Sequence, residues 1–409
     1  MYTQNSIIDV WPFTRQADGG EVIIGRPDTG TFLAVSPEAV EILDFLACGR
    51  TVAEVAEASH SDPADILMFL TSLTGAGLVK PYGAEADREG RGTGPKAVRY
   101  HLAHFPIPLA RAIFSWPALI VCFAIIVAAV AAVIIHPALR PRVADLYFTH
   151  DRTLILASIL VISFGSVVIH EICHLIAARA KGVESRLGVG NRLWAFVVEA
   201  DLTGLWSIPR RERYLPLLAG SLFDAVMSSV ILLVLFANRR GESFLSPFLV
   251  QLLRAILLTY VTRILWQFCL FVRTDYYYVI ANAFGCRNLM GDTEAFLRNQ
   301  VVRVFRRIKP VDQSSIPLPE FRVIRGYAVL WILGRLIALT FLFEVTLPLV
   351  YQYTMNTVRA VSTGYAANRG NFIDSILMSC IFGVPFAIGM GMWLFSLARR
   401  LTRLEIVTQ

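Results

Sequence analysis

Charged side chains are scarce in this chain of 409 residues. Only 17% of the residues are Asp, Glu, Lys or Arg, whereas 55% are hydrophobic, and the mean hydropathy is +0.56. The length alone would permit two or three soluble domains, but soluble domains carry more charge than this. The composition therefore predicts an integral membrane protein.

Closely spaced cysteine pairs and a secretion signal are also missing. The six cysteines are scattered and form no CxxC motif, so we expect neither a disulfide framework nor a thiolate metal cage. Residues 1–20 hold no basic segment followed by an apolar one, so we expect no cleavable signal peptide. The formal charge of +7 comes from basic residues at the ends of apolar segments, which is typical of membrane topology and does not require nucleic acid as a partner.

The first 95 or so residues contain no run long enough to span a bilayer. Short β-type segments occupy 21–25 and 31–35, and Leu78-Val79 is a possible closing strand. Three helices are expected: the first begins with Ser36 as N-cap and Pro37 at its first position, the second starts near Thr51, and the third starts at Asp62-Pro63. These elements predict a small α+β, winged-helix-like domain over 1–85, followed by a linker over 86–108.

This portion resembles the PqqD-like peptide-binding domain, which holds leader peptides during the maturation of ribosomally made peptides. The resemblance rests on Thr31-Phe-Leu-Ala-Val-Ser-Pro-Glu-Ala, Leu43-Asp-Phe-Leu-Ala-Cys-Gly-Arg-Thr-Val-Ala-Glu-Val and Leu73-Thr-Gly-Ala-Gly-Leu-Val. It implies a peptide partner that adds as an extra strand beside the β-segments. The alternative is a winged helix that dimerises or binds DNA, but the stretch from Asp62 to Thr74 has no Lys or Arg, which counts against DNA.

Six later segments are long and apolar enough to cross a membrane. They are 112–135, 153–178, 215–237, 247–271, 326–350 and 373–397. The long connections at 179–213 and 272–325 are rich in arginine, and the C-terminal tail adds three more. By the positive-inside rule, we expect a multi-pass, all-α protein of the inner (plasma) membrane whose termini and long basic connections face the cytoplasm.

The second apolar segment ends in His170-Glu171-Ile-Cys-His174. On a helix the two imidazoles lie one turn apart on one face and can reach one ion. Glu171 lies beside them, where a carboxylate could accept a proton from a water molecule that the metal activates. A polar network without metal is the alternative, but three ionisable residues inside a membrane run favour a functional site.

A catalytic zinc takes three protein ligands, so a third ligand must come from elsewhere in the chain. The other histidines lie in the soluble portion, before the first span or in segments expected outside. The acids near the membrane are Glu199, Asp201, Asp224 and Asp275. Asp275 follows the fourth apolar segment, on the membrane side that the topology assigns to His170, but the spacing alone leaves all four acids open as the third ligand.

Three motifs together resemble the site-2 protease family of intramembrane zinc metallopeptidases. They are HExxH at the end of an apolar helix, Leu218-Ala-Gly-Ser-Leu-Phe-Asp224 and Asp275-Tyr-Tyr-Tyr. Two further stretches resemble the peptide zinc metalloprotease branch of that family: Glu199-Ala-Asp-Leu-Thr-Gly-Leu-Trp-Ser-Ile-Pro-Arg and Thr274-Asp-Tyr-Tyr-Tyr-Val-Ile-Ala-Asn. The chain departs from the family where Tyr276 replaces glycine and where Ser221 and Asp224 replace proline and asparagine.

The resemblance implies a site-2 protease-like core at about 150–290, within a membrane domain over 109–409. The implied site holds Zn²⁺ through three ligands and adds one catalytic base: His170, His174, Asp275 and Glu171. Asp224 is the alternative to Asp275 as the third ligand. We therefore predict a zinc metalloendopeptidase that cleaves a precursor peptide at the cytoplasmic side of the membrane, in the maturation of a ribosomally made, modified peptide. Asp201 and Asp224 are candidate substrate-binding residues. The alternative is a non-catalytic membrane protein that binds, exports or gives immunity to such a peptide, and the oligomeric state stays open.

Two features admit two interpretations each. Arg263 and Arg335 interrupt apolar segments, so they either line a wet cavity that substrate enters or are paired structurally. The β-type run Ala195-Phe-Val-Val-Glu-Ala-Asp either offers an edge strand to an extended substrate or forms a connecting hairpin.

Overall fold

A computed structural model describes residues 2–81, 100–149, 152–241, 244–304, 310–314, 316–365 and 369–406. Most of the predicted linker, 86–99, lies outside these residues. The chain forms two compact units. The first comprises Met1–Ala112, Leu175–Leu187 and Ala200–Pro216, and the second comprises Ile113–His174, Gly188–Glu199 and Leu217–Gln409.

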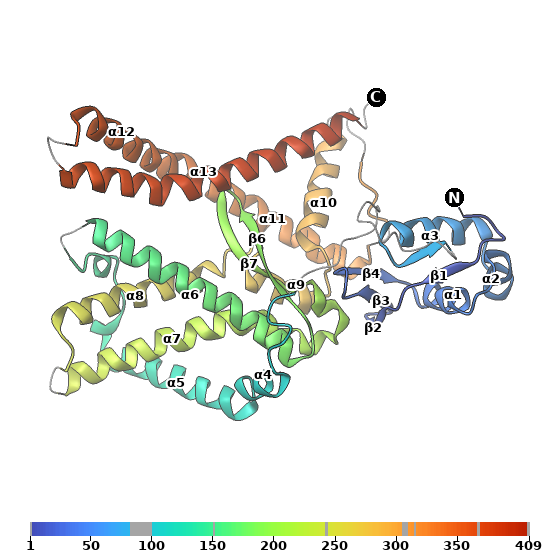
Figure 1. Cartoon of the computed structure of the whole chain (residues 1–409), viewed down its shortest axis with the longest axis horizontal. Helices are drawn as coiled ribbons and strands as arrows, with labels where there is room; N and C mark the ends of the chain where they lie inside the picture. The colour runs from blue at the N-terminus through green and yellow to red at the C-terminus, as the bar shows by residue number, and fades with distance from the viewer. Residues whose placement is uncertain are drawn as a thin grey trace. The chain divides into compact units, whose positions relative to one another are not determined.

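The N-terminal region is rich in short strands and holds three helices (Figure 1). Its elements are β1 (Ile8–Val10), β2 (Thr14–Asp18), β3 (Glu21–Arg26), β4 (Thr31–Val35), α1 (Pro37–Ala47), α2 (Val52–Ser59), α3 (Pro63–Gly75) and β5 (Val79–Pro81). Strands β2, β3 and β4 form an antiparallel sheet in that order, while β1 pairs antiparallel with β5. The predicted strands and helices are confirmed, whereas β1 and β2 were not predicted.

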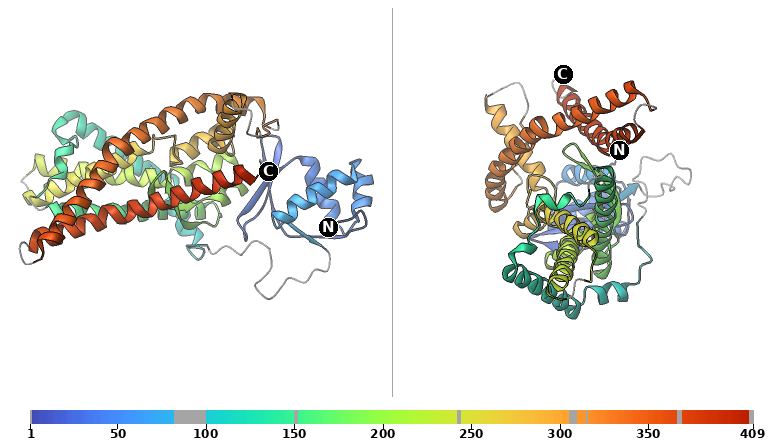
Figure 2. Two further views of the ribbon diagram at one scale, coloured as in Figure 1. Left: turned by 90° about the horizontal axis from the view of Figure 1, so that it is seen from above. Right: turned by 90° about the vertical axis from the view of Figure 1, so that its left-hand side faces the viewer.

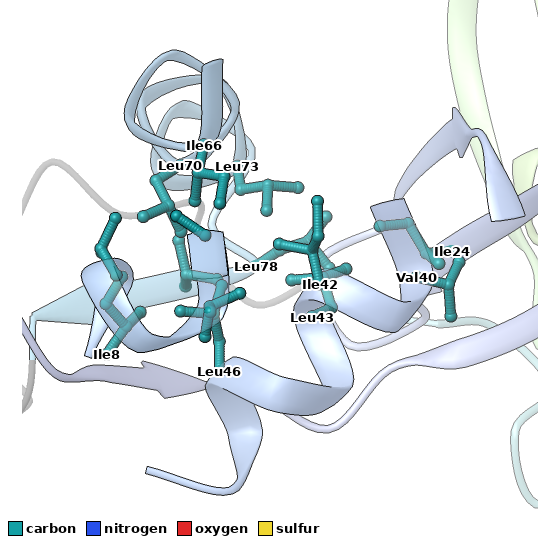
Figure 3. Close-up of a cluster of buried hydrophobic side chains, with 14 residues drawn as sticks. Ile8, Ile24, Val40, Ile42, Leu43, Leu46, Ile66, Leu70, Leu73 and Leu78 are labelled. Carbon is teal, nitrogen blue, oxygen red and sulfur yellow. The ribbon is translucent and has the colours of Figure 1, made fainter. Parts of the chain in front are cut away.

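Helix starts in this region follow the expected capping chemistry. Ser36 accepts a hydrogen bond from the amide of Ala39, and Asp62 accepts one from the amide of Ala64 at 2.8 Å. Thr51 and Glu54 form a reciprocal capping box at the start of α2. The helices then bury one apolar face each in a common core (Figure 3), whose fully buried members include Ile24, Leu43, Leu46, Ile66, Leu70 and Leu73.

Six helical stretches within the described residues are long and apolar enough to cross a membrane, as predicted. They cover Ile107–Ile135, Ala157–Ala180, Arg210–Arg240, Pro247–Trp266, Leu318–Thr363 and Phe372–Arg399. The helices in these stretches are α4 (Ile107–Ile113), α5 (Trp116–Ile135), α6 (Arg152–Ala180), α7 (Tyr214–Arg240), α8 (Pro247–Trp266), α11 (Leu318–Phe341), α12 (Leu347–Thr363) and α13 (Arg369–Ile406). The chain is therefore a predominantly helical, multi-pass membrane protein.

The fifth of these stretches is longer than predicted, because the helix continues past an internal proline. Pro348 has no N–H to donate to the carbonyl four residues earlier, and its ring crowds that carbonyl. The chain forms a short π-helix over Leu342–Thr346 just before the proline and continues as the α-helix α12. Helix α12 packs along α13 (Figure 2). In that pair the Thr357 hydroxyl donates to the carbonyl of Ser375 at 2.8 Å.

A β-hairpin interrupts the helices directly after α6. Strand β6 (Arg186–Arg192) pairs with β7 (Ala195–Asp201), and Leu193 in the connecting turn has a φ of +59°. The hairpin end, which is the turn between β6 and β7, approaches α13 at Gly389. A Cβ added at Gly389 would lie 2.1 Å from the carbonyl oxygen of Trp194. Two shorter helices, α9 (Asp275–Phe284) and α10 (Leu289–Val304), lie between α8 and α11 in the sequence.

Candidate metal centre

Two imidazoles of α6 form one side of the candidate site. His170 and His174 are 3% and 2% exposed, and their Nε2 atoms lie 3.2 Å apart. The four-residue spacing places both rings on one helix face, as the HExxH motif predicts. Because α6 is mainly apolar and long enough to span a membrane, the pair lies in a segment where unpaired polar groups are costly.

Asp275 completes the cluster from the start of α9. Thr274 caps this helix by accepting from the amide of Tyr277, and Asp275 is its first residue. Gln267 fixes the turn, because its side-chain oxygen accepts from the Asp275 amide at 3.0 Å and its carbonyl accepts from the Thr274 hydroxyl at 2.8 Å. Tyr276 lies inside the helix and has no positive φ, so the backbone does not require glycine at this position.

The three ligand atoms fit one small ion. Oδ2 of Asp275 lies 3.2 Å from Nε2 of His170 and 3.4 Å from Nε2 of His174, which closes a triangle with the 3.2 Å between the two nitrogens. A tetrahedral ion with ligands at about 2.0–2.1 Å sets its ligand atoms about 3.3–3.4 Å apart. The group His170, His174 and Asp275 is buried and could hold a metal ion.

Gly220 of α7 lies against the same triangle. A Cβ added at Gly220 would lie 2.4 Å from Nε2 of His170 and 2.4 Å from Nε2 of His174. Real Cβ atoms do not approach other atoms so closely, so only glycine lets the backbone of α7 pass the two ligand nitrogens. Gly220 therefore forms one wall of the space between the ligand atoms.

A second layer of polar groups orients the ligands. Asp224 is completely buried, and its Oδ2 lies 2.9 Å from Nδ1 of His170. Arg263 of α8 binds both oxygens of Asp224, with Nε 2.7 Å from Oδ2, and also donates to the Ser166 hydroxyl at 2.7 Å. The Arg263 guanidinium lies over the Tyr260 ring, 4.8 Å from its centre. Of the two interpretations of Arg263, structural pairing is the one that these contacts support.

Asp275 has its own support in α7. The Ser221 hydroxyl donates to Oδ2 of Asp275 at 3.0 Å. Burial by itself raises the pKa of Asp275, but the adjacent imidazoles lower it by more, so this pKa lies below its ordinary value. The carboxylate is therefore held in the anionic form that binds metal.

Two other predicted site residues, Glu171 and Asp201, are not among the three clustered ligands. Glu171 is 7% exposed and follows His170 directly in α6. Asp201, at the end of β7, accepts hydrogen bonds from Arg186 at 2.8 Å and from the amide and hydroxyl of Thr203. Their roles as catalytic base and substrate-binding residue stay predictions, as does the substrate role of Asp224.

Gly220, Ser221 and Gln267 support the ligands but were not predicted to do so from the sequence. Asp224 and Arg263 were not predicted to pair, although two opposite charges within apolar helices are a signal for pairing. For Ser221 and Gln267 no such signal exists, since uncharged polar residues in spans are common and their partners depend on helix rotation.

No protein-family model, curated protein or solved structure matches this chain.

Proposed function

We propose that this chain is an intramembrane zinc metalloendopeptidase with a site-2 protease-like core at about 150–290. The observation that carries the proposal is the convergence of His170, His174 and Asp275 beside Glu171, within helices that are apolar enough to span a membrane. Two nitrogens and one carboxylate oxygen are a common ligand set for catalytic zinc and leave a position for water.

The metal, when bound, supplies a Lewis acid that lowers the pKa of water and polarises a scissile carbonyl. His170 must present an unprotonated Nε2, and Asp224 favours that tautomer by accepting the proton on Nδ1. Glu171, which is not one of the three ligands, accepts the proton of the attacking water and delivers it to the leaving amine. The buried surroundings of Glu171 favour this exchange, because burial keeps bulk water from competing for the proton.

The proposal also assigns a PqqD-like role to the N-terminal region. Strand β4 has β3 as its neighbour on one side of the three-stranded sheet, so among the described residues β4 is an edge strand. An extended precursor peptide can add to such an edge through main-chain hydrogen bonds. The basic connections support placing this region and both termini in the cytoplasm.

The test uses the full chain, purified in detergent and incubated with a proteome-derived peptide library read by mass spectrometry. We expect about one zinc per chain in the wild type, new peptide termini in its digest, and a Glu171→Gln variant that keeps zinc but produces no cleavage. Asp275→Ala should lose both zinc and cleavage, whereas Asp374→Asn, which changes an exposed acid of α13, should lose neither. Cleavage at the wild-type rate by Glu171→Gln, or a wild type without zinc, overturns the proposal. A zinc-loaded wild type that cleaves no peptide points to the non-catalytic alternative.

A further inference from the structure

A cavity of about 580 Å³ lies between α10 and the beginning of α11. It belongs to neither the metal centre nor the N-terminal region, since its lining residues fall between Phe296 and Arg325. Both helices contribute to its wall, together with the segment around Gln313 and Ser314 that precedes α11.

Side-chain hydrogen bonds to the backbone fix this wall. The Asn299 amide group donates to the carbonyl of Val311 and accepts from its N–H, both at 2.8 Å. The Gln313 side chain donates to the carbonyl of Asp292 at 2.8 Å and lies 3.3 Å from the Asn299 amide nitrogen. The segment before α11 is therefore tied to α10, so the cavity is preformed.

The cavity has a positive lining. Arg303 of α10 and Arg325 of α11 both face it, and none of the described residues that line it is acidic. Both arginines are exposed, and Arg303 lies 3.1 Å from the Gln300 side-chain oxygen, which also lines the cavity. Guanidinium groups bind phosphate oxygens through paired hydrogen bonds, so this lining favours an anionic group with several oxygens.

One part of the lining is aromatic. The rings of Phe296 and Phe321 meet edge to face, with their centres 5.6 Å apart. Such a surface suits the apolar part of an amphipathic molecule better than it suits a small hydrated anion. The ligand should therefore carry an anionic group and an apolar body at neighbouring positions.

The place of the cavity indicates the source of such a molecule. Arg325 and Phe321 lie in the first turns of α11, the helix that opens the fifth membrane-spanning stretch at Leu318. Leu318 itself is 75% exposed, so the beginning of this helix presents apolar surface outward. Lipid headgroups are concentrated at the ends of membrane spans, and basic pockets at such ends bind anionic headgroups. We propose that this cavity binds the phosphodiester headgroup of an anionic membrane lipid, with Arg303 and Arg325 on the phosphate and the two phenylalanines against the glycerol and the first acyl carbons.

The test measures binding of short-chain phosphatidylglycerol to the full chain in detergent by native mass spectrometry. We expect the double variant Arg303→Gln/Arg325→Gln to bind at least about tenfold more weakly, because two charge-assisted hydrogen-bonding groups are removed. Arg303→Lys keeps the charge but lacks the paired N–H donors of the guanidinium group. Its affinity for phosphatidylglycerol should lie between that of the wild type and that of the double variant. Arg322→Gln is the matched control, since Arg322 is exposed on the same helix but does not line the cavity.

Two further ligands distinguish the source of the anion. Short-chain phosphatidylcholine should bind weakly because its headgroup has no net charge, and glycerol 3-phosphate should bind weakly because it lacks the apolar body. If the double variant and the wild type bind phosphatidylglycerol equally well, the proposal that this cavity binds the lipid is wrong. If glycerol 3-phosphate binds as tightly as phosphatidylglycerol, the ligand is not a lipid, and the cavity is assigned to a soluble anion instead. Unchanged helical circular dichroism in the double variant confirms that a loss of binding is not a loss of folding.

Discussion

The imidazole of His170 bridges two carboxylates: its Nδ1 lies 2.9 Å from Oδ2 of Asp224, and its Nε2 lies 3.2 Å from Oδ2 of Asp275. The first contact fixes the proton on Nδ1 and thereby leaves the Nε2 lone pair for a metal. Arg263 in turn neutralises Asp224, so the buried carboxylate does not add an uncompensated charge to an apolar helix bundle.

Removal of Asp224 should weaken metal binding without removing a ligand. In Asp224→Ala, His170 loses the acceptor for Nδ1–H and Arg263 loses its partner, so we expect the zinc affinity to fall about 10–100-fold. Asp224→Asn retains one acceptor oxygen and should show a smaller fall. Competition with a fluorescent chelator measures the affinity. A wild-type affinity in Asp224→Ala would show that the Asp224 contact does not support the metal site.

Gly220→Ala should exclude the metal while leaving the helix intact. The new methyl group would lie 2.4 Å from both ligand nitrogens, so the imidazoles or α7 must move. Alanine itself favours a helix over glycine by about 1 kcal/mol, so a general loss of helix is not expected. Zinc content per chain measures the effect. The control is Gly165→Ala in α6, where nothing lies within 4 Å of the added Cβ and the zinc content should not change.

Asp18 should contribute strongly to the stability of the first unit. Its Oδ1 accepts from Nε of Arg210 at 3.0 Å, its Oδ2 accepts from Arg213 at 2.9 Å, and Arg213 is 3% exposed. Asp18→Ala leaves a buried guanidinium without this carboxylate, which costs about 3–5 kcal/mol of unfolding free energy. Amide hydrogen exchange of strand β2 measures the change.

The matched comparison for Asp18 is the exposed pair of Arg15 and Asp44, whose side chains are both 47% exposed. Solvent screens such a pair, so Asp44→Ala should cost at most about 1 kcal/mol. Equal effects of the two substitutions would contradict the assigned importance of the buried Asp18 cluster.

Local signals in the sequence were sufficient for the helices and for the two histidines of the candidate site. Pro37 and Pro63 follow their capping residues, and the apolar runs have the length of a membrane span, so both features could be predicted from neighbours in the chain. The expected topology made Asp275 a candidate, because its apolar segment ends on the same side as His170, and the resemblance of Asp275-Tyr-Tyr-Tyr to a site-2 protease motif then led to its prediction as the third ligand.

The parts that could not be predicted depend on distant partners. The strand Ile8–Val10 is short and pairs with residues about 70 positions later, so no local pattern indicates it. The Ser221 hydroxyl reaches Asp275 only because α7 and α9 are rotated toward each other. The π-helix before Pro348 likewise depends on whether a helix stops or continues at an internal proline, and the sequence permits both.

Acid should destabilise the end of the β6–β7 hairpin at which β6 begins and β7 ends. Burial raises the pKa of Asp201, but the Thr203 hydrogen bonds and the Arg186 ion pair lower it by more, so this pKa lies below its ordinary value of about 3.9. A lowered folded-state pKa means that Asp201 stabilises the fold fully above the unfolded-state pKa, and that this stabilisation disappears as the pH falls through the folded-state pKa.

Protection of the Thr203 amide against hydrogen exchange reports on this carboxylate, because that amide donates to Oδ1 of Asp201 at 3.1 Å. We expect constant protection from about pH 8 to 5, after correction for the intrinsic rate, and a decline below about pH 4. Asp201→Asn should remove the decline, whereas Asp65→Asn, at an exposed position of α3, should retain it. A decline that persists in Asp201→Asn would assign the acid sensitivity to another group.

The contact between the hairpin end and α13 should depend on a single glycine. A Cβ at Gly389 would lie 2.1 Å from the Trp194 carbonyl oxygen and 2.8 Å from the Phe196 amide nitrogen, and backbone atoms cannot yield as a flexible side chain can. Gly389→Ala should therefore displace the hairpin end from α13 and raise hydrogen exchange at residues 194–196. Gly391→Ala is the matched control, because two residues further along the same helix nothing lies within 4 Å of the added Cβ. Since alanine favours the helix equally at both positions, a rise in Gly389→Ala alone isolates the steric contact, and an equal rise in both variants would instead assign the effect to α13 itself.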